Sequence, residues 1–497
     1  MTQIPIKDVY YTEPYRPQFH YSPESNWLND PNGMVYYNGE YHLFYQYHPH
    51  GTTWGPMHWG HAVSSDLVSW EHLPVALEPD SIGAIFSGSA VVDWQDTTGF
   101  FDGESGLVAI FTHAGTYPDS DRPRQVQSIA YSKDNGRTWQ LYEGNPVLSD
   151  ESKPDFRDPK VFWHTETNRW VMVLATGQTI SIYTSPNLKE WTFASEFGEN
   201  QGFHEGVWEC PDLFELPVDG DPSASKWVLL VSVGDHPHLA EGSRTQYFIG
   251  EFNGTAFSNE HSEGTTLWLD YGRDNYAGVS WSDIPHSDSR RVYIGWMSNW
   301  KYANLTPSTK WRGAMTLPRT LSLASSEQGI RLVQSPVEEL KALRSQSILL
   351  KENEDVDQTE AVYMPETNTY ELEAEFQIGD TSVFGFSLCT SSTEKTIVGY
   401  DVKSEQLFMD RTASGQVDFH EGFAAKHQAV LSPKEGKIKL RIFVDWSSVE
   451  VFANDGEIAM TDLIFPDSDS RTVELFIEDG KVTLVSLIVH PLQTIWK

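Results

Sequence analysis

The sequence predicts an all-β protein, a five-bladed β-propeller followed by a C-terminal β-sandwich. Three observations predict it. Short strand-like runs with frequent turn signals fill the chain and leave few helical periods. A three-strand unit of roughly 50–70 residues recurs five times, which is typical of propeller blades. A change of pattern near Ser335–Arg344 separates these units from a strongly alternating C-terminal part.

Each repeated unit has the same layout without strict sequence identity. A polar or acidic residue enters a short strand, a very apolar second strand follows, and a third strand ends near an aromatic residue. The units begin at Asn29-Asp30-Pro31, Phe86–Ser89, Arg157-Asp158-Pro159, Glu209-Cys210-Pro211 and Asp274–Tyr276. Three of them close on similar polar tips, SSDLVSW (64–70), SKDNGRTW (132–139) and SPNLKEW (185–191). We assign the propeller to residues 1–335, because the alternative, an array of β-sandwiches, lacks this period.

The C-terminal part predicts a second domain. SPVEELKALR (335–344) has a helical pattern, and we expect a helical linker over residues 336–350. Lys351–Asp357 is acidic and turn-like. Beyond it, segments such as TYELEAEFQIG (369–379) and IKLRIFVDW (438–446) alternate strongly, which predicts a β-sandwich over residues 351–497. Because no linker is long or of low complexity, we expect the two domains to be rigidly docked.

Composition excludes several classes of function. The net charge of −35 repels phosphate backbones and anionic lipids, so we expect neither nucleic-acid nor membrane partners. The two cysteines, Cys210 and Cys389, form no disulfide framework or zinc spacing, and both are expected to be small buried residues. No cofactor or metal is predicted. The first twenty residues do not read as a secretory signal, which predicts a cytoplasmic protein, or a secreted one if a signal was removed before this numbering.

Three of the five unit starts carry a carboxylate, namely Asp30, Asp158 and Glu209. In a propeller the first strands surround one axis, so we expect these side chains to converge at one mouth. Each is followed closely by a proline, which restricts the backbone before it. A single Asp-Pro is usually a turn, but three acids at equivalent positions of a repeat predict an acidic pocket. Mutual repulsion there raises at least one pKa, as a general acid requires.

Three motifs sharpen this prediction. WLNDPNG (27–33), FRDP (156–159) and WECP (208–211), in this order, resemble the signature motifs of glycoside hydrolase family 32, which contains invertases, inulinases and levanases. The resemblance extends to FSGS (86–89), GRDNY (272–276), GWMSNW (295–300) and FVDWSSVEVF (443–452), and is strongest to bacterial levanases and exo-inulinases. One departure is Trp446, where relatives commonly have a basic residue; we expect it to alter the domain interface at most.

The resemblance implies that Asp30 is the nucleophile and Glu209 the general acid/base. Asp158 would hold the fructose hydroxyls and stabilise the transition state. A retaining mechanism needs two carboxyls about 5–5.5 Å apart, one to attack and one to protonate the leaving oxygen. From the residues themselves, we expect Arg157 to keep Asp158 ionised and the neighbouring Trp208 to favour protonated Glu209.

Eight further side chains are candidate substrate contacts. Amide, hydroxyl and aromatic groups suit a sugar, because they offer paired hydrogen bonds and stacking surfaces. They are Asn29, Gln46, Trp54, Phe86, Ser87, Arg157, Tyr276 and Trp300. For each aromatic residue, packing within a blade is the alternative, and Trp296 competes with Trp300. His48, His50, His58 and His61 match no standard metal spacing, so we expect hydrogen-bonding or core roles for them.

These features predict an exo-acting, retaining β-fructofuranosidase that releases terminal fructose from levan, inulin and sucrose. Alternatives with the same site are a sucrose-specific invertase and a fructosyltransferase, which passes the fructosyl group to a sugar instead of water. An inverting five-bladed glycosidase acting on arabinan-like substrates would need its carboxyls about 6.5–9.5 Å apart. A non-catalytic fructan-binding protein is the alternative outside enzymes, and the presence of all three acids argues against it.

Overall fold

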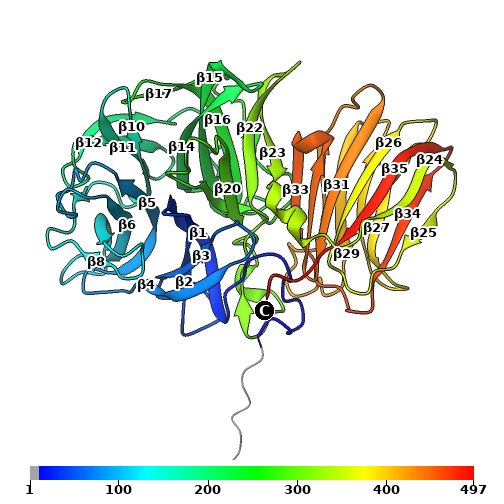
Figure 1. Ribbon diagram of the computed structural model, residues 1–497, viewed down its shortest axis with the longest axis horizontal. Helices are drawn as coiled ribbons and strands as arrows, with labels where there is room; N and C mark the ends of the chain where they lie inside the picture. The colour runs from blue at the N-terminus through cyan, green and yellow to red at the C-terminus, as the bar shows by residue number, and fades with distance from the viewer. Residues whose placement is uncertain (1–9, 497) are drawn as a thin grey trace, which may run out of the picture.

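The computed structural model describes residues 10–496, and its regular structure is almost entirely β-strand (Figure 1). Within these residues the helical elements are three short 3-10 helices, η1 (Ala303–Leu305), η2 (Glu338–Leu343) and η3 (Asn454–Gly456). The all-β prediction is therefore confirmed. The chain forms an N-terminal group of sheets, on the left of Figure 1, and two stacked C-terminal sheets on the right.

The N-terminal group contains four hydrogen-bonded sheets. The first has β1 (Asn26–Tyr37), β2 (Glu40–His48), β3 (His58–Ser64), β4 (Glu71–Leu77) and the short β21 (Trp311–Arg312). The second has β5 (Ala84–Asp93), β6 (Gly106–Thr116), β7 (Pro123–Ser132), β8 (Gln140–Leu141) and β9 (Leu148–Ser149). The third has β10 (Arg157–His164), β11 (Arg169–Ala175), β12 (Ile180–Ser185) and β13 (Thr192–Phe197).

The fourth N-terminal sheet has nine strands in two antiparallel groups. One group is β14 (Trp208–Val218), β15 (Asp221–Val233), β16 (Arg244–Phe252), β17 (Phe257–Asn259) and β18 (Leu267–Trp268). The other is β19 (Tyr276–Ser280), β20 (Arg291–Trp296), β22 (Arg319–Ser326) and β23 (Gly329–Pro336). A single parallel pair, Val218 with Leu323, joins the two groups.

The first strands of five strand groups contact one another in a closed ring. β1 contacts β5, β5 contacts β10, β10 contacts β14, β14 contacts β19, and β19 contacts β1. We call these five strands the inner ring. Each pairs antiparallel with the next strand of its own group, so the remaining strands lie outside the ring.

Every inner-ring strand has a β-bulge near its start. In each case two residues face a single residue of the neighbouring strand. The bulged pairs are Asn29-Asp30, Phe86-Ser87, Asp158-Pro159, Cys210-Pro211 and Ala277-Gly278. A bulge breaks the strand's alternation and re-aims side chains, and it also accommodates a proline that cannot donate to the ladder. The prolines of the acidic motifs lie at or directly after these bulges.

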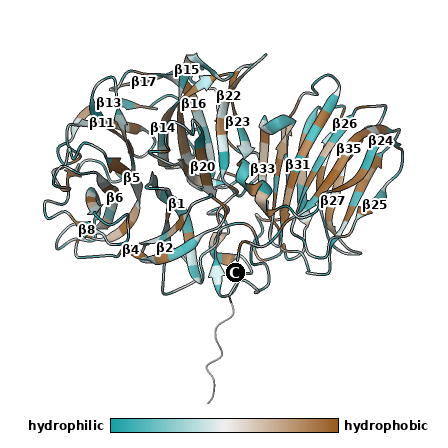
Figure 2. Cartoon of the chain, viewed as in Figure 1, coloured by the Kyte–Doolittle hydropathy of each residue, from teal (hydrophilic) through white to brown (hydrophobic). Residues whose placement is uncertain are grey.

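The C-terminal sheets have six strands each and enclose a continuous apolar core. One sheet has the order β24 (Ile348–Val356), β35 (Val482–Pro491), β26 (Tyr370–Gln377), β31 (Lys437–Asp445), β32 (Ser448–Ala453) and β33 (Ile458–Leu463). The other has β25 (Glu360–Tyr363), β34 (Thr472–Glu478), β27 (Val383–Thr390), β28 (Lys395–Asp401), β29 (Gln406–Ala413) and β30 (Lys426–Val430). Apolar residues concentrate on these strands, as they do on those of the N-terminal sheets (Figure 2).

The turn expected over Lys351–Asp357 is wrong. Most of this segment belongs to β24, the edge strand that pairs with β35. Its acidic side chains are exposed, because an edge strand has little to cover it, and charges there also discourage pairing with another chain. In place of the linker helix expected over residues 336–350, the structure has the short 3-10 helix η2, Glu338–Leu343.

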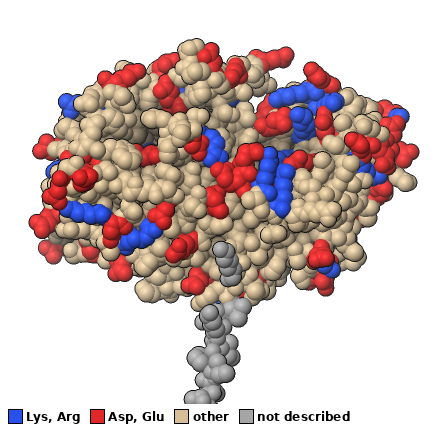
Figure 3. Space-filling model, viewed as in Figure 1, with Lys and Arg blue, Asp and Glu red and all other residues tan. Residues whose placement is uncertain are grey.

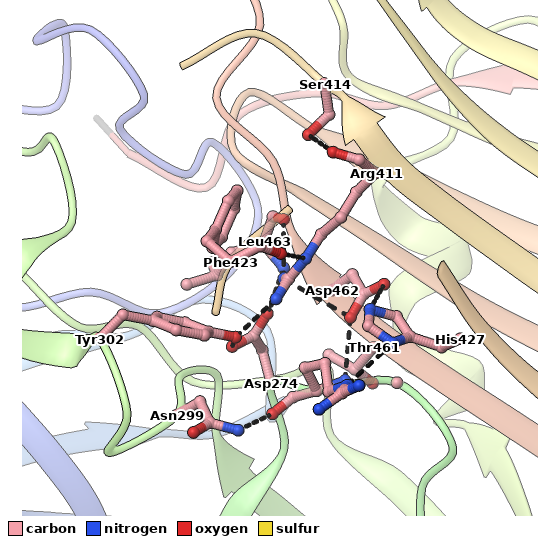
Figure 4. A network of polar contacts seen from close by, with 12 residues as sticks. Asp274, Asn299, Tyr302, Arg411, Ser414, Phe423, His427, Thr461, Asp462 and Leu463 are labelled. Carbon is pink, nitrogen blue, oxygen red and sulfur yellow. Dashed lines mark hydrogen bonds and ion pairs between the residues drawn. The ribbon is translucent and has the colours of Figure 1, made fainter. Parts of the chain in front are cut away.

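Buried ion pairs join the N-terminal and C-terminal parts. Arg319 donates to Glu450 at 2.6 Å, and both side chains are fully buried. In the network of Figure 4, the Asp274 carboxylate receives hydrogen bonds from Tyr302 at 2.6 Å and from Arg411 at 2.5 Å. Since a buried charge is costly without its partner, these pairs hold the two parts in one arrangement. Trp446 follows Asp445, which binds His20 at 2.8 Å in the same interface.

The visible surface is rich in acidic side chains. Figure 3 shows acidic side chains scattered over the visible face of both parts, in keeping with the net charge of −35. Among residues 10–496, none of the helices has the length and apolar character required to cross a bilayer.

Candidate active site

Asp30 lies in the bulge of β1 and binds neutral donors. Asn29 Nδ2 donates to Asp30 Oδ1 at 2.9 Å, and Ser87 Oγ, from the bulge of β5, donates to Oδ2 at 3.1 Å. The Asn29 amide is itself oriented by Trp27, whose Nε1 donates to Asn29 Oδ1 at 2.7 Å. Asp30 is thus oriented as an acceptor, and no lysine, arginine or histidine among residues 10–496 forms an ion pair with it.

Asp158 lies in the bulge of β10 and is 7% exposed. Its Oδ2 accepts a hydrogen bond from the backbone N–H of Cys210 at 3.1 Å. Its φ of +63° is a left-handed conformation that costs a non-glycine residue energy, although aspartate adopts it more readily than most residues. The hydroxyl of Thr112 accepts from the Asp158 backbone N–H at 3.0 Å and helps to hold this conformation.

Glu209 stands directly before the bulge of β14. Its Oε1 accepts hydrogen bonds from Arg157 Nη2 at 3.0 Å and Nε at 3.2 Å, and its Oε2 accepts from the Tyr276 hydroxyl at 2.5 Å. With 24% of its side chain exposed, against 7% for Asp158, Glu209 is the more accessible carboxyl to an entering ligand.

The three acids do not occupy equivalent positions. In the ladder registers, Glu209 aligns with Arg157 and Tyr276, the last residues paired before each bulge. Asp158 is the first residue of its bulge, and Asp30 is the second residue of its own. The expectation of equivalence is therefore wrong by one or two residues. Because of this stagger, the positions equivalent to Glu209 on the neighbouring strands are Arg157 and Tyr276. The pocket is therefore not a ring of like charges.

Burial shapes the electrostatics of the pocket. Desolvation, followed by the nearby charge of Glu209, raises the pKa of Asp30 to about 6, although Asn29 and Ser87 lower it in part. Desolvation also raises the pKa of Asp158 to about 7; Arg157 opposes this shift but does not cancel it.

The Arg157 guanidinium binds Glu209 and Asp155, and it forms an ion pair with Asp158 at 3.9 Å. Arg157 lowers the pKa of Asp158 as expected, but burial raises that pKa by more. The expectation about Trp208 is wrong. Trp208 does not form the surroundings of the Glu209 carboxyl, because successive strand residues face opposite sides. The Trp208 ring is fully buried in an apolar cluster with Phe248, behind the strand.

The remaining candidate substrate contacts lie on the wall and at the rim of the catalytic pocket. Gln46 faces the bulge of Asn29-Asp30 from β2, and its buried Nε2 has no hydrogen-bond partner in the described chain, so it is available to a hydroxyl. Trp54 is 47% exposed, and its ring lies 6.3 Å from that of Phe86, which belongs to the β5 bulge. These aromatic rings form a rim beside Asp30 and Ser87.

Trp300 and Trp296 have different positions. Trp296 ends β20 and is fully buried, whereas Trp300 follows the strand and is partly buried. Their ring centroids are 4.8 Å apart, and Trp300 stacks on Trp27 at 6.0 Å. Trp300 is therefore placed beside the residue that orients Asn29, and Trp296 packs behind it.

Cys210 is a site residue that the sequence analysis missed. It is buried, as expected, but its thiol lies 3.6 Å from both Asp30 Oδ2 and Asp158 Oδ2. Its φ of +44° again marks a strained bulge residue. Its position inside the WECP motif, directly after Glu209, could have identified it as a site residue. Cys389, by contrast, packs only in the C-terminal apolar core.

The C-terminal part holds the segment that carries Tyr276. The backbone N–H groups of Arg273 and Asp274 donate to the carbonyl of Thr461 in β33, at 3.0 and 2.9 Å. The Asp274 carboxylate also accepts from the backbone N–H of Leu463 at 2.8 Å (Figure 4). Tyr276 follows two residues later, so β33 helps to position the hydroxyl that binds Glu209.

The histidines have ordinary polar roles. His61 Nε2 lies 3.0 Å from His42 Nδ1, while His48 and His58 bond to the carbonyls of Thr53 and Pro56. Within residues 10–496, no cluster of three or more His, Cys, Asp or Glu side chains could hold a metal ion.

Staggered carboxylates with an arginine, a tyrosine and amide groups on an all-β frame define a glycoside hydrolase. The chain belongs to glycosyl hydrolase family 32: residues 20–336 match the family's N-terminal domain and residues 339–491 its C-terminal domain.

Relatives agree with this assignment. The chain is 56% identical to a levanase of Bacillus subtilis, over 98% of this chain and 72% of that protein. It is 41% identical to an extracellular exo-inulinase of Aspergillus niger, over 98% of this chain and 96% of the other. Among solved structures, the exo-inulinase of Aspergillus awamori superposes with a TM-score of 0.88 at 39% identity, covering 98% of this chain and 100% of that one.

Proposed function

We propose that this enzyme is a retaining, exo-acting β-fructofuranosidase that releases terminal fructose from levan, inulin and sucrose. The observation that carries the proposal is the contrast between two carboxyls of one pocket. Asp30 is half-buried and its carboxylate binds the neutral donors Asn29 and Ser87, as suits a nucleophile, whereas Glu209, also half-buried, is held by Arg157 and Tyr276. The levanase and exo-inulinases to which the chain is similar support the choice of substrate.

We propose the following mechanism on the basis of these positions. The Asp30 carboxylate attacks the anomeric carbon while Glu209 gives its proton to the glycosidic oxygen, and the bond between that oxygen and the carbon breaks. Water then attacks the fructosyl ester, Glu209 takes its proton, and Asp30 leaves as a carboxylate. Asp158, with the higher pKa, holds the fructose hydroxyls by hydrogen bonds. The remaining candidate contacts, Gln46, Trp54, Phe86 and Trp300, surround the sugar and the leaving group.

We also propose the finer architecture. The closed inner ring supports a five-bladed propeller over residues 1–335, and the two stacked C-terminal sheets support a β-sandwich over residues 351–497. The expected linker over residues 336–350 is shorter, because β24 of the C-terminal sheet already begins at Ile348. We infer that the enzyme acts outside the cell, since the inulinases to which it is similar are extracellular. Its neutral substrate suits the acidic surface, which disfavours nucleic acid and membranes.

Product analysis at early times tests the proposal. Purified protein is incubated separately with levan, inulin and sucrose. At early times we expect fructose as the small sugar released from levan and inulin, and equal amounts of glucose and fructose from sucrose. A ladder of oligosaccharides would mean endo-cleavage. Activity on sucrose alone would identify an invertase, and longer fructosides formed from sucrose would identify a transferase.

A further inference from the structure

A second cavity lies at the other end of the inner ring. Its volume is about 1010 Å³. The bulges that carry the catalytic groups lie at the starts of the ring strands, whereas this cavity is lined by later residues of three of them, such as Val92, His164 and Glu215. It therefore opens on the face of the ring opposite the catalytic pocket.

Lys160 separates the two ends. It lines both the second cavity and a small void of about 10 Å³ beneath Asp158. Its ammonium donates to the carbonyl of Ser280 at 2.6 Å and lies 3.3 Å from Asp212. Lys160 therefore lies between the second cavity and the void beside Asp158, and we treat the second cavity and the catalytic pocket as separate sites.

A rigid, exposed tryptophan stands in the second cavity. Trp94 is 58% exposed, and its Nε1 donates to Asp283 Oδ1 at 2.9 Å. The other oxygen of Asp283 accepts from the backbone N–H of Val92 at 3.0 Å, and the Tyr37 ring packs edge-on against Trp94 at 5.8 Å. The indole is thus held in place with most of its apolar surface in water, an arrangement that suits a stacking platform.

The rest of the lining matches the chemistry of a neutral saccharide. Trp163, Phe162 and Trp227 add partly exposed aromatic surface. Arg291 lies over the Phe214 ring at 5.0 Å and, within the described chain, donates one hydrogen bond, to the Trp281 carbonyl. Its other N–H groups are available to hydroxyls. The lining also contains carboxylates, such as Glu166, Glu215 and Asp288, which can accept hydrogen bonds from hydroxyls. Aromatic surface beside such planar polar groups suits an uncharged, hydroxyl-rich ligand, and these acids, like the net charge of −35, disfavour an anion.

We propose that this cavity is a second, non-catalytic binding site for a fructan segment, with Trp94 as its stacking platform. The ligand class rests on the proposed function. Such a site would hold a polymer on the enzyme while another chain end occupies the catalytic pocket.

Titration calorimetry tests the proposal by counting sites. In the Asp30→Ala protein, which cannot form the covalent intermediate, we expect a short linear inulin oligosaccharide to bind at two sites per chain. Adding Trp94→Ala should remove one of them, while Trp94→Phe, which keeps a ring but loses the bond to Asp283, should weaken it by less than about tenfold. Phe193→Ala is the matched control, because Phe193 is 55% exposed but lies on the outer strand β13; it should leave two sites.

One site in the Asp30→Ala protein, or two sites retained after Trp94→Ala, would overturn the second site. Fructose release from inulin by the wild-type protein is measured in parallel. If fructose is released but one site is counted, only the second site is refuted. If no fructose is released, the proposed function fails, whereas a Trp94-dependent site would still support saccharide binding here.

Discussion

At the scale of single residues, the Ser87 hydroxyl tunes the proposed nucleophile. Burial and the charge of Glu209 raise the pKa of Asp30 to about 6, and the hydrogen bond from Ser87 lowers it in part. Since Asp30 attacks as a carboxylate, kcat/KM should rise with pH through about 6. In Ser87→Ala this rise should move to higher pH, because a donor to the charged form is lost. The pH profile of kcat/KM on sucrose measures it, and an unmoved acid limb would contradict the role of Ser87.

Glu209 has a different predicted signature. Glu209→Gln removes the proton donor, so substrates with poor leaving groups should slow by about 100-fold or more. An activated aryl fructoside needs little protonation, and its formation of the fructosyl ester should slow far less. Burst kinetics with the two substrates separate these cases. Equal slowing of both would exclude Glu209 as the acid.

Asp158 should reduce stability above neutral pH. Because desolvation raises the pKa of Asp158 to about 7 from 3.8, the folded protein binds more protons than the unfolded chain between these values. Stability therefore falls as pH rises through this window. Asp158→Asn removes the effect, and it should stabilise the fold by about 1–3 kcal/mol at pH 8 and little at pH 4.

Urea denaturation at the two pH values measures this difference. The surface variant Asp102→Asn is the control, since the Asp102 side chain is 90% exposed. If Asp158→Asn destabilises the protein equally at both pH values, the pKa of Asp158 is not raised in the folded protein.

At the scale of elements, the segment before β1 joins the two parts through His20. The ring nitrogens of His20 lie 2.8 Å from Asp445 and 2.9 Å from Glu450, near the end of β31 and in β32. Burial disfavours the charged ring, but the hydrogen bonds to these two acids outweigh burial and raise the pKa of His20 to about 9. The segment is thus held to the C-terminal sheet by a charged histidine.

This contact should make stability depend on alkaline pH. A raised folded-state pKa means that the contribution is fully present below about pH 6.5 and is lost as pH rises through about 9. The wild-type protein should lose about 1–3 kcal/mol over this window, beyond the loss seen in His20→Gln. Melting temperatures of both proteins from pH 6 to pH 10 decide it. Parallel curves would show that His20 is not charged in the fold.

At the scale of the whole molecule, neither part is self-sufficient in its buried charges. Arg319 pairs with Glu450, and Asp274 with Arg411, across the interface. Separating the two parts breaks these pairs and exposes apolar side chains that pack across the interface, such as Tyr302 against Phe423. Residues 1–335 expressed alone should therefore be inactive or aggregate, and co-expression with residues 336–497 should restore activity. Sucrose hydrolysis by the purified fragments measures this. A fully active fragment 1–335 would refute the dependence.

The sequence by itself determined the all-β fold class and the family, and it supplied the three acids that we propose for catalysis. Strand alternation and turn chemistry are local, so they are readable along the chain. The motifs around Asp30, Asp158 and Glu209 kept their order and spacing, which made the family recognisable, and the matches over residues 20–336 and 339–491 confirm it.

Only the tertiary structure decided what each acid touches. The Ser87 hydroxyl reaches Asp30 across 57 residues, and Arg157 reaches Glu209 across 52. The β-bulges stagger the acids by single residues, which a repeat unit of about 50–70 residues does not specify. The place of Cys210 between two carboxylates and the pairing of Arg411 with Asp274 likewise join distant segments. Such contacts arise from the closure of the ring and the docking of the two parts, and local patterns do not encode them.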